Sequence, residues 1–553
     1  MVLLEVMSSL RKSIKESVEA CQRFCGVKFE IPKINLEFPE LKIHGELSTN
    51  AALVFSKKFL LSPMALAEIM LKNFRKPECI EDIRVELPGF INFFLSKSFF
   101  KKVLLDIDKN LENYTEKNKK NKKILVEFVS ANPTGPMHIG NARLGALGDS
   151  LSEALKFAGF DVYKEFYVND AGNQIKKFAE SLAARYVQIF DPTAKFPEDG
   201  YHGNDIKELA DKFEKVHGSS YSNCDRKILE KAILDYALPK NIKNMKLNLM
   251  RYKVRYDNWF HESSLYDSGE IYSVLNKLKD GGATYTMEGA LWFRATAFGA
   301  QKDEVLVRSN GIPTYFAADI AYHVNKFLVR KFDICVDFLG ADHQGHIPRM
   351  RAAMKFFDID DSRLKFIIVQ LVRIVKGGEV VKMSKRLGKA ETLEDFIEQI
   401  SVDCSRFIFN MQDANSAMDF DVNNALENDS NNPSYYVKYA YVRIQSILKK
   451  FSEIPDKKRL NLELLDSEFE HKLIFEISKF PYIISEVADL MNPTLLARYA
   501  VNLASVFHKF YNADKVKNES VSLSNARHFL CLQTAKIIKI ILKILKMDIL
   551  EGM

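Results

Sequence analysis

Residues 124–141 read ILVEFVSANPTGPMHIGN, and this stretch decides the fold. Its first seven residues form an apolar, β-rich run that is typical of a buried parallel strand. The loop that follows contains two prolines and two glycines. Apolar residues then recur at intervals of three and four from about 142 to 158, which predicts a helix, and a second strand-like run covers 162–168. The stretch therefore predicts a βαβ unit, whose ligands bind at the carboxyl ends of strands and at helix N-termini.

The α/β pattern extends well beyond this unit. Strand-like runs at 290–294, 334–339 and 366–371 continue it, and a polar, helical stretch at about 190–290 interrupts it. We therefore expect a Rossmann-like catalytic domain at 124–415, with a helical insertion at about 190–290.

Two further domains flank this one. Residues 1–114 open with a helical pattern and continue with alternating runs at 34–38 and 86–95, which predicts a small α+β domain. A linker at 115–123 holds five lysines and no apolar residue; we interpret it as solvated, with a nucleic-acid contact as the alternative. Residues 416–553 carry amphipathic helices and are expected to form an all-α bundle.

Length and composition limit the possible classes of protein. A chain of 553 residues exceeds the roughly 250–300 residues of a single core, so several domains are expected. Hydrophobic residues make up 47% and charged residues 27%, which excludes disorder as the dominant state. The net charge is +7, and from Asn431 to Met553 there are 18 Lys and Arg against 13 Asp and Glu. The excess is compatible with a polyanionic partner at this end.

Cysteine usage and hydropathy indicate the compartment. Seven cysteines without a CxxC argue against a disulfide framework, and we expect them to act as small core residues. No apolar run reaches the ~18 residues of a membrane span, and the best candidate, 537–550, contains three lysines. The N-terminus reads as a first helix. We expect a soluble, cytoplasmic protein that does not enter a membrane.

Two short motifs indicate the chemistry. One is Pro136-Met-His138-Ile-Gly140-Asn141, between the first strand and its helix; the other is Val381-Lys-Met-Ser-Lys-Arg386, much later in the chain. Each alone is weakly specific. Together, and in this order, they resemble the HIGH and KMSKS signatures of class I aminoacyl-tRNA synthetases.

The resemblance implies activation of an amino acid by ATP. Negative charge develops on phosphate oxygens as pyrophosphate leaves, so donors and cations placed at those oxygens promote the step. The HIGH region is Ala131–Asn141, and Asn141 stands where the family usually has a second histidine. The implied catalytic residues are His138, Asn141, Lys382 and Lys385. The implied ATP-binding residues are His138, Gly140, Asn141, Asp342, His343, Met383, Ser384 and Lys385, with Mg²⁺ arriving on ATP.

Other segments identify the subfamily that the chain resembles, the arginyl-tRNA synthetases. One segment departs from it: Gly299-Ala-Gln-Lys-Asp303 stands where members often read Gly-Asp-Asp-Lys-Asp. The resemblance covers essentially the whole chain. Its segments are 127–135, 168–174, 256–263, 289–293, 310–323, 340–346, 432–440 and the helix around Tyr511.

A guanidinium needs carboxylates and other acceptors in fixed geometry, which an ammonium ion cannot match. The resemblance places Glu127 and Asp319 as the acids, with Tyr315 and Gln344 completing the side-chain and α-amino contacts and Asn132 holding the amino-acid main chain. A buried Glu127 is also compatible with a structural ion pair. Asp342, His343 and His346 suggest metal ligands at first sight. Because no zinc-type cysteines accompany them, we assign them to the substrate pocket and expect no structural metal.

The flanking domains are then expected to contact tRNA(Arg), the N-terminal one at the outer corner and the C-terminal one at the anticodon. The resemblance implies a monomer that charges tRNA with L-arginine and needs bound tRNA even for activation. Two alternatives remain. One is a class I enzyme for another amino acid such as cysteine, which the missing zinc ligands disfavour. The other is a non-catalytic tRNA-binding relative, which the presence of His138 and Lys385 disfavours.

Overall fold

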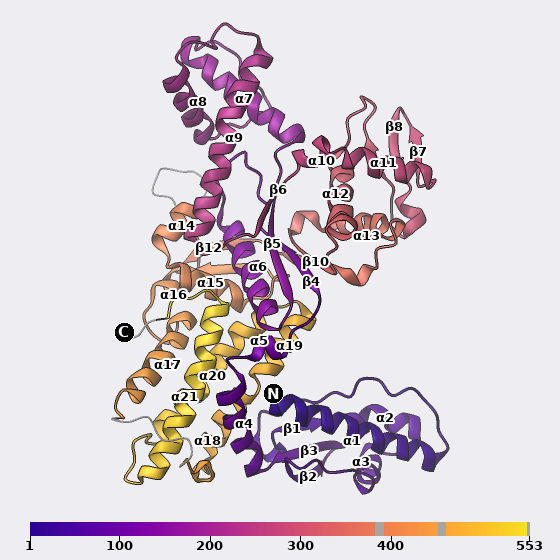
Figure 1. Ribbon diagram of the computed structural model, residues 1–553, viewed down its shortest axis with the longest axis vertical. Helices are drawn as coiled ribbons and strands as arrows, with labels where there is room; N and C mark the ends of the chain where they lie inside the picture. The colour runs from indigo at the N-terminus through magenta and orange to yellow at the C-terminus, as the bar shows by residue number, and fades with distance from the viewer. Residues whose placement is uncertain (382–391, 452–459, 550–553) are drawn as a thin grey trace.

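The computed structural model describes residues 1–381, 392–451 and 460–549. Figure 1 shows a central sheet with two lobes above it, a long helical bundle below it, and the N-terminal domain beside the lower end of that bundle. None of the helices within the described ranges has the length and apolar content that crossing a bilayer requires.

The central sheet is parallel and doubly wound. Its strand order is β11-β10-β4-β5-β6, so the first strand of the unit, β4, lies in the middle and the chain changes direction between β4 and β10. Helix α6 (Ile139–Phe157) connects β4 to β5, which confirms the predicted βαβ unit. The strands are β4 (Lys123–Glu127), β5 (Asp161–Val168), β6 (Asn258–His261), β10 (Ile334–Gly340) and β11 (Leu364–Val369).

The bounds of the helical insertion in the structure differ from the expected ones, about 190–290. The helical lobe begins earlier and ends before β6, which pairs with β5 and belongs to the main sheet. The run at 290–294 lies in a separate antiparallel sheet of order β7-β8-β9, not in the parallel one. The first lobe contains α7 (Gly172–Phe190), α8 (Asn204–His217) and α9 (Arg226–Arg251). The second contains α10 (Ser263–Asp267), α11 (Glu270–Asp280), β7 (Thr284–Met287), β8 (Ala290–Phe293), β9 (Glu304–Val307), α12 (Tyr315–Val324), η3 (Asn325–Val329) and α13 (Ile347–Phe356).

A third small sheet joins the catalytic domain to the bundle. Its order is β13-β12-β14, with β12 (Val372–Lys376), β13 (Glu379–Val380) and β14 (Met418–Asp421). Because β14 pairs with β12, residues 416–421 are not part of the expected all-α region, which begins only after them. The helices around this sheet are α14 (Leu393–Gln399), α15 (Val402–Met411) and α16 (Val422–Leu426).

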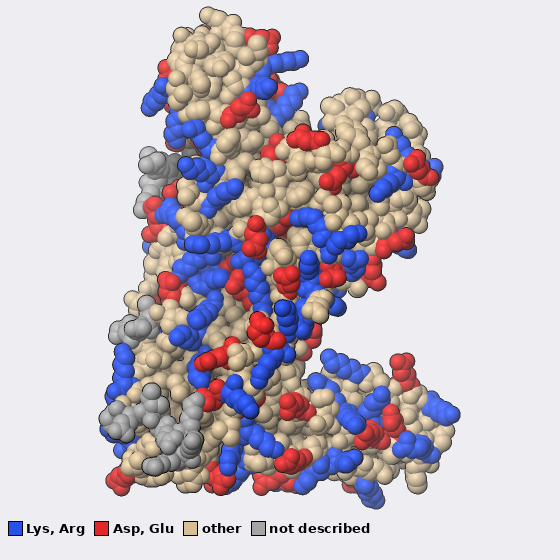
Figure 2. Space-filling model, in the orientation of Figure 1, with Lys and Arg blue, Asp and Glu red and all other residues tan. Residues whose placement is uncertain are grey.

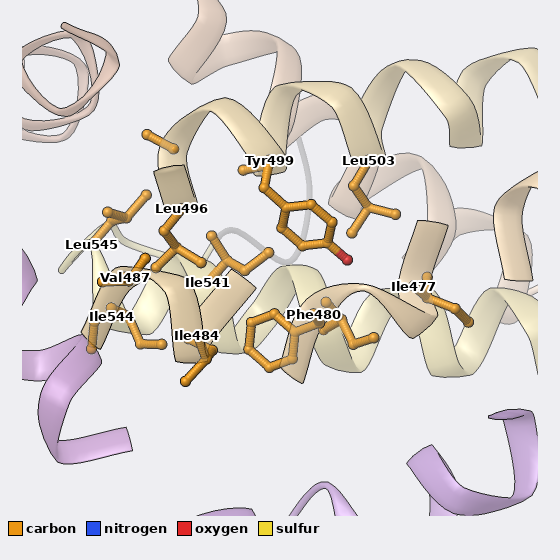
Figure 3. Close-up of a cluster of buried hydrophobic side chains, with 14 of the residues drawn as sticks. Ile477, Phe480, Ile484, Val487, Leu496, Tyr499, Leu503, Ile541, Ile544 and Leu545 are labelled. Atoms are coloured by element: carbon orange, nitrogen blue, oxygen red, sulfur yellow. The ribbon is translucent and has the colours of Figure 1, made fainter. Parts of the chain in front are cut away.

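The C-terminal bundle is held by apolar faces at helical spacing. Figure 3 shows its core, where Phe480 and Tyr499 lie among aliphatic side chains. The Tyr499 hydroxyl donates to the Glu476 carbonyl at 2.9 Å, so the one polar atom of that ring is satisfied. The helices are α17 (Pro433–Leu448), α18 (Glu468–Ser478), α19 (Phe480–Leu490), α20 (Thr494–Ala513) and α21 (Val521–Ile544).

The N-terminal domain is α+β, as predicted. Its sheet has the order β1-β3-β2, and the expected strand at 34–38 is reduced to a single bridge between Glu37 and Ser48. Cys21 is buried, whereas Cys25 is exposed and not a core residue. A short helix, α5, covers the start of the Lys-rich linker. The elements are α1 (Val2–Cys25), β1 (Leu47–Thr49), α2 (Ala51–Phe59), α3 (Pro63–Lys72), β2 (Ile80–Glu86), β3 (Phe90–Leu95), α4 (Lys97–Asn110) and α5 (Tyr114–Lys117).

Candidate active site

The candidate site lies at the carboxyl ends of β4 and β10, where the strand order changes direction. Open α/β sheets bind their ligands at this position. The loop after β4 carries the HIGH region, and η4 (Ala341–His346) follows β10 directly. Two segments that are about 200 residues apart in the chain are thereby brought to one edge of the sheet.

His138 is the N-cap of α6. Its Nδ1 accepts from the Gly140 N–H at 3.1 Å, and the Asn141 Oδ1 accepts from the His138 N–H at 2.9 Å. An acceptor at Nδ1 places the ring proton on Nε2, and desolvation lowers the pKa of the imidazole, which favours the neutral form. A Cβ at Gly140 would lie 2.8 Å from the His138 ring, so any other residue here would displace that ring. The motif thus presents a neutral N–H donor at a helix N-terminus.

The residues that follow the KMSKS-like segment contact the HIGH loop. Thr392 forms a β-bridge with His138, and the Leu393 N–H donates to the Met137 carbonyl at 2.7 Å. The four motif residues Lys382, Met383, Ser384 and Lys385 lie outside the described residues. The chain that follows them is fixed against the HIGH loop.

Helix α12 supplies the next part of the site. Tyr315 and Asp319 lie one turn apart on it, as their spacing predicts. Asp319 accepts from the His346 Nε2 at 2.5 Å and lies 3.4 Å from the His323 Nδ1. Burial alone would raise the pKa of Asp319, but these two hydrogen bonds hold it well below its usual range. Tyr315 is 52% exposed, and the nearby Asp319 carboxylate raises the pKa of its hydroxyl.

Glu127 is the last residue of β4, and its carboxylate accepts hydrogen bonds from two protein groups. Its Oε2 accepts from the Lys326 Nζ at 2.7 Å, and its Oε1 accepts from the Ser130 hydroxyl at 2.9 Å. The structural ion pair considered from the sequence is therefore present. Val129 and Ser130 both have positive φ, 71° and 40°, a conformation that costs free energy for a β-branched residue. This strained turn directs the Ser130 hydroxyl back to Glu127.

The sequence did not single out Glu262, which is 4% exposed and directly follows β6. Burial, Asp170 and Asp319 together raise the pKa of Glu262 to about 7, and the Tyr167 hydroxyl bonds to it. Glu262 thus belongs to the same acidic group as Asp319. Its segment, 256–263, resembles the family, but no local pattern marks the acid, because a four-residue strand at the far edge of the sheet brings it there.

The remaining predicted residues lie around this edge. Asn132, in the HIGH loop, accepts from the Asn169 amide at 2.9 Å, which links the loops after β4 and β5. Asp342, His343 and Gln344 lie in η4, with the His343 Nε2 3.6 Å from Asp342. No three His, Cys, Asp or Glu side chains form a metal-binding group within the part of the chain that the structure describes.

A second candidate surface lies on the bundle, between α17 and α20. Tyr435 and Tyr439 stack at 5.9 Å, and the Arg443 guanidinium lies 4.5 Å from the Tyr439 ring centre and 5.0 Å from that of Tyr511. These four side chains are only partly buried. Exposed aromatic rings beside an arginine are the groups on which unpaired bases stack. Figure 2 shows Lys and Arg intermixed with acidic residues over the middle of one face, so charge alone does not mark the partner surface.

Three family models match the chain. The class I (R) tRNA synthetase catalytic domain matches residues 103–443, the arginyl tRNA synthetase N-terminal domain matches 8–95, and the DALR anticodon binding domain matches 437–553.

Curated relatives and solved structures agree with these matches. Proteins named arginine–tRNA ligase from Caldanaerobacter subterraneus subsp. tengcongensis and Acetivibrio thermocellus are 45% and 44% identical; the alignments cover 99% and 100% of this chain, and 97% and 100% of theirs. The arginyl-tRNA synthetase structures from Thermus thermophilus and Plasmodium falciparum have TM-scores of 0.78 and 0.76, over 98% and 99% of this chain and 100% and 99% of theirs. Their identities of 19% and 20% establish the likeness of fold alone.

Proposed function

The chain belongs to the arginyl-tRNA synthetase family and is an arginine–tRNA ligase, and from that premise we propose how its own residues carry out the reaction. Arginine and ATP give arginyl-adenylate and pyrophosphate, and the arginyl group then passes to the 3′-terminal ribose of tRNA(Arg). One observation supports this assignment of residues above all: the capped His138 and the acidic pocket lie together, at the ends of adjacent strands.

In the activation step, an arginine carboxylate oxygen attacks the α-phosphorus and the bond to pyrophosphate breaks. The His138 Nε2–H donates to phosphate oxygens as their charge increases, and the N-terminus of α6 adds its dipole. Asn141 holds the His138 backbone, so it acts as a positioning residue through its side-chain acceptor. Lys385, assisted by Lys382, neutralises the departing pyrophosphate. Gly140, Asp342, His343, Met383 and Ser384 complete the ATP site, and Mg²⁺ accompanies ATP as a counter-ion of its phosphates.

The guanidinium of arginine binds between carboxylates. Asp319 stays ionised because His346 donates to its carboxylate and the His323 imidazole lies beside it, and Glu127 presents a fixed carboxylate at the end of β4. Tyr315 closes the open side of this pocket. Asn132 and Gln344 contact the main chain and α-amino group of the substrate.

The flanking domains hold the tRNA. The cluster of Tyr435, Tyr439, Arg443 and Tyr511 suits the unpaired bases of the anticodon loop, and the N-terminal domain contacts the outer corner of the tRNA. We infer that the enzyme is a cytoplasmic monomer.

Replacement of Lys385 by Ala tests the activation step. Arginine-dependent pyrophosphate exchange, measured with tRNA present, should fall by at least about 100-fold, because an electrostatic donor to the transition state is lost. Binding of tRNA should be almost unchanged. Lys376→Ala, at an exposed lysine on β12, is the matched control and should keep its exchange activity. Normal exchange in the Lys385 variant would refute the role of this residue.

A further inference from the structure

Lys326 is a buried ammonium that the roles above do not use. It lies on η3, its side chain is 0% exposed, and its Nζ is 2.7 Å from the Glu127 Oε2 and 2.8 Å from the Asp337 Oδ1. Glu127 and Asp337 are register partners on β4 and β10. One cation therefore bridges two neighbouring strands directly beneath the arginine pocket.

These two acids belong to a row that continues across the sheet. Glu165, the register partner of Glu127 on β5, accepts from both Arg330 terminal nitrogens, at 2.5 and 2.9 Å. The cations therefore come from one helical segment. Lys326 lies in the π-helical turn η3, and Arg330 is the residue that caps its carboxyl end, so both cations face this row.

Only one acid of the row opens toward the pocket. The Glu127 side chain is 12% exposed, whereas Asp337 is 3% and Glu165 is 1% exposed. Lys326 and Ser130 hold one oxygen each of this carboxylate. Its plane is therefore fixed before a substrate arrives, and the remaining lone pairs of Glu127 have one orientation.

The charge of Lys326 also favours the ionised form of Glu127, whose pKa is raised overall. Burial raises the pKa of Glu127, and Lys326 is the strongest influence that lowers it again, whereas Asp337 acts in the same direction as burial. His323 makes a smaller contribution of the same sign as Lys326. The titratable and charged groups around Glu127 are Asp337 of β10, Glu165 and Tyr167 of β5, Tyr256, Lys326 of η3, and Tyr315, Asp319, Tyr322 and His323 of α12.

We propose that Lys326 is a positioning residue for arginine selection, which orients the Glu127 carboxylate and keeps it ionised so that it accepts the planar guanidinium. The inference rests on the proposed role of Glu127 in binding arginine. A planar, fixed acceptor favours a fork of donors over a point charge, so Lys326 contributes to the preference for arginine over lysine.

The test is Lys326→Met, which keeps the length of the side chain and removes the charge. The KM for arginine in aminoacylation should rise at least about 10-fold at pH 7, with kcat and the KM for ATP changed much less. Because Glu127 then ionises only at higher pH, the pH at which the KM reaches its lower plateau should move up by about one unit or more. Lys326→Arg should restore part of the affinity.

Lys164→Met is the matched control. Lys164 is also buried in the main sheet and also lies between two carboxylates, Asp149 and Glu153, at 3.0 Å each, but away from the pocket. Its loss should lower the melting temperature without moving the arginine KM or its pH profile. If both methionine variants are less stable and both keep the wild-type KM for arginine and its pH dependence, Lys326 has only a structural role.

Two further variants separate the remaining outcomes. If Lys326→Met does not fold, the double variant Lys326→Met with Asp337→Asn removes the second buried charge. It carries the same expected change in KM, with a smaller shift of the pH profile because Asp337 no longer raises the pKa of Glu127. Glu127→Gln tests the premise: an unchanged arginine KM in that variant refutes the proposed role of Glu127 itself. The KM for arginine could instead rise in Glu127→Gln and stay at the wild-type value, with the wild-type pH dependence, in the Lys326 variants. That outcome refutes only the inference about Lys326.

Discussion

At the scale of single residues, Glu262 connects pH with substrate binding. Its pKa is raised to about 7 by burial and by the neighbouring carboxylates of Asp170 and Asp319. A carboxyl group with a raised pKa is protonated below that value and ionised above it. The KM for arginine should therefore fall as the pH rises from 6 to 8, because a third carboxylate, in addition to Asp319 and Glu127, becomes available to the guanidinium. Steady-state aminoacylation at saturating ATP and tRNA measures this dependence.

The control for this prediction is Glu262→Gln, which keeps the shape of the side chain and removes the titration. The variant should have a KM about 10- to 150-fold above the wild-type value at pH 8, since a hydrogen bond to a charged group contributes about 1.5–3 kcal/mol. The difference should shrink toward pH 6. If the KM for arginine of the glutamine variant fell with rising pH as steeply as that of the wild type, another group would be responsible for the titration.

These residues also show how far the sequence predicts the site. His138, Tyr315 and Asp319 lie in stretches where a motif or a helical spacing fixes their mutual position, and the structure places them accordingly. Glu262 and Lys326 carry no such local signal. They reach the pocket through pairing of distant strands and through a π-helical turn, and both features depend on contacts far apart in the chain.

At the scale of elements, the packing of α6 on β4 holds the HIGH loop in place. A Cβ at Gly148 would lie 2.3 Å from the Phe128 Cγ, and the Phe128 ring is fully buried. Gly148→Ala should therefore push α6 away from the sheet, at a cost of about 1–3 kcal/mol in the free energy of unfolding. Because His138 caps the same helix, kcat should fall as well. Thermal unfolding and pyrophosphate exchange measure both effects.

Gly145→Ala on the same helix is the control for this prediction. A Cβ there meets the Val254 side chain at 3.4 Å, which is an ordinary contact. Replacing a mid-helix glycine by alanine contributes about 0.5–1 kcal/mol to helix stability. This variant should be as stable as the wild type or slightly more stable, and equally active. Equal losses in the two variants would mean that the close approach to Phe128 is not the cause.

The sequence predicts the type of an element correctly where a hydrophobic pattern repeats over many residues. The βαβ unit and the amphipathic helices α17 and α20 have many residues that repeat the same spacing, so their type is well determined. Strands β6 and β14 have four residues each and were missed. Such strands are defined by their partners, β5 and β12, and not by their own pattern.

At the scale of the whole molecule, the side chain of Arg406 connects the bundle to the catalytic domain. It is fully buried on α15, and its donors reach Asp149 of α6 at 2.6 Å, the Leu545 carbonyl after α21 at 3.1 Å, and the Tyr252 carbonyl after α9 at 3.2 Å. One guanidinium thus satisfies acceptors from three other segments. The helix that carries His138 and the end of the last bundle helix share this contact.

Arg406→Met should therefore affect stability and coupling together. Breaking a buried ion pair from one side costs about 3–5 kcal/mol. Here the Asp149 Oδ2 and two carbonyls lose a donor, whereas the Asp149 Oδ1 keeps Lys164. Arg373→Met removes an ion pair with Asp419 whose side chains are 63% and 47% exposed, and should cost less than about 1 kcal/mol. Calorimetric unfolding compares the two variants. In addition, the KM for tRNA should rise in the Arg406 variant, in aminoacylation and in pyrophosphate exchange alike, because both steps are expected to need tRNA that the bundle holds in register with the active site. An unchanged KM for tRNA together with a lower kcat would place the effect of Arg406 within the catalytic domain alone.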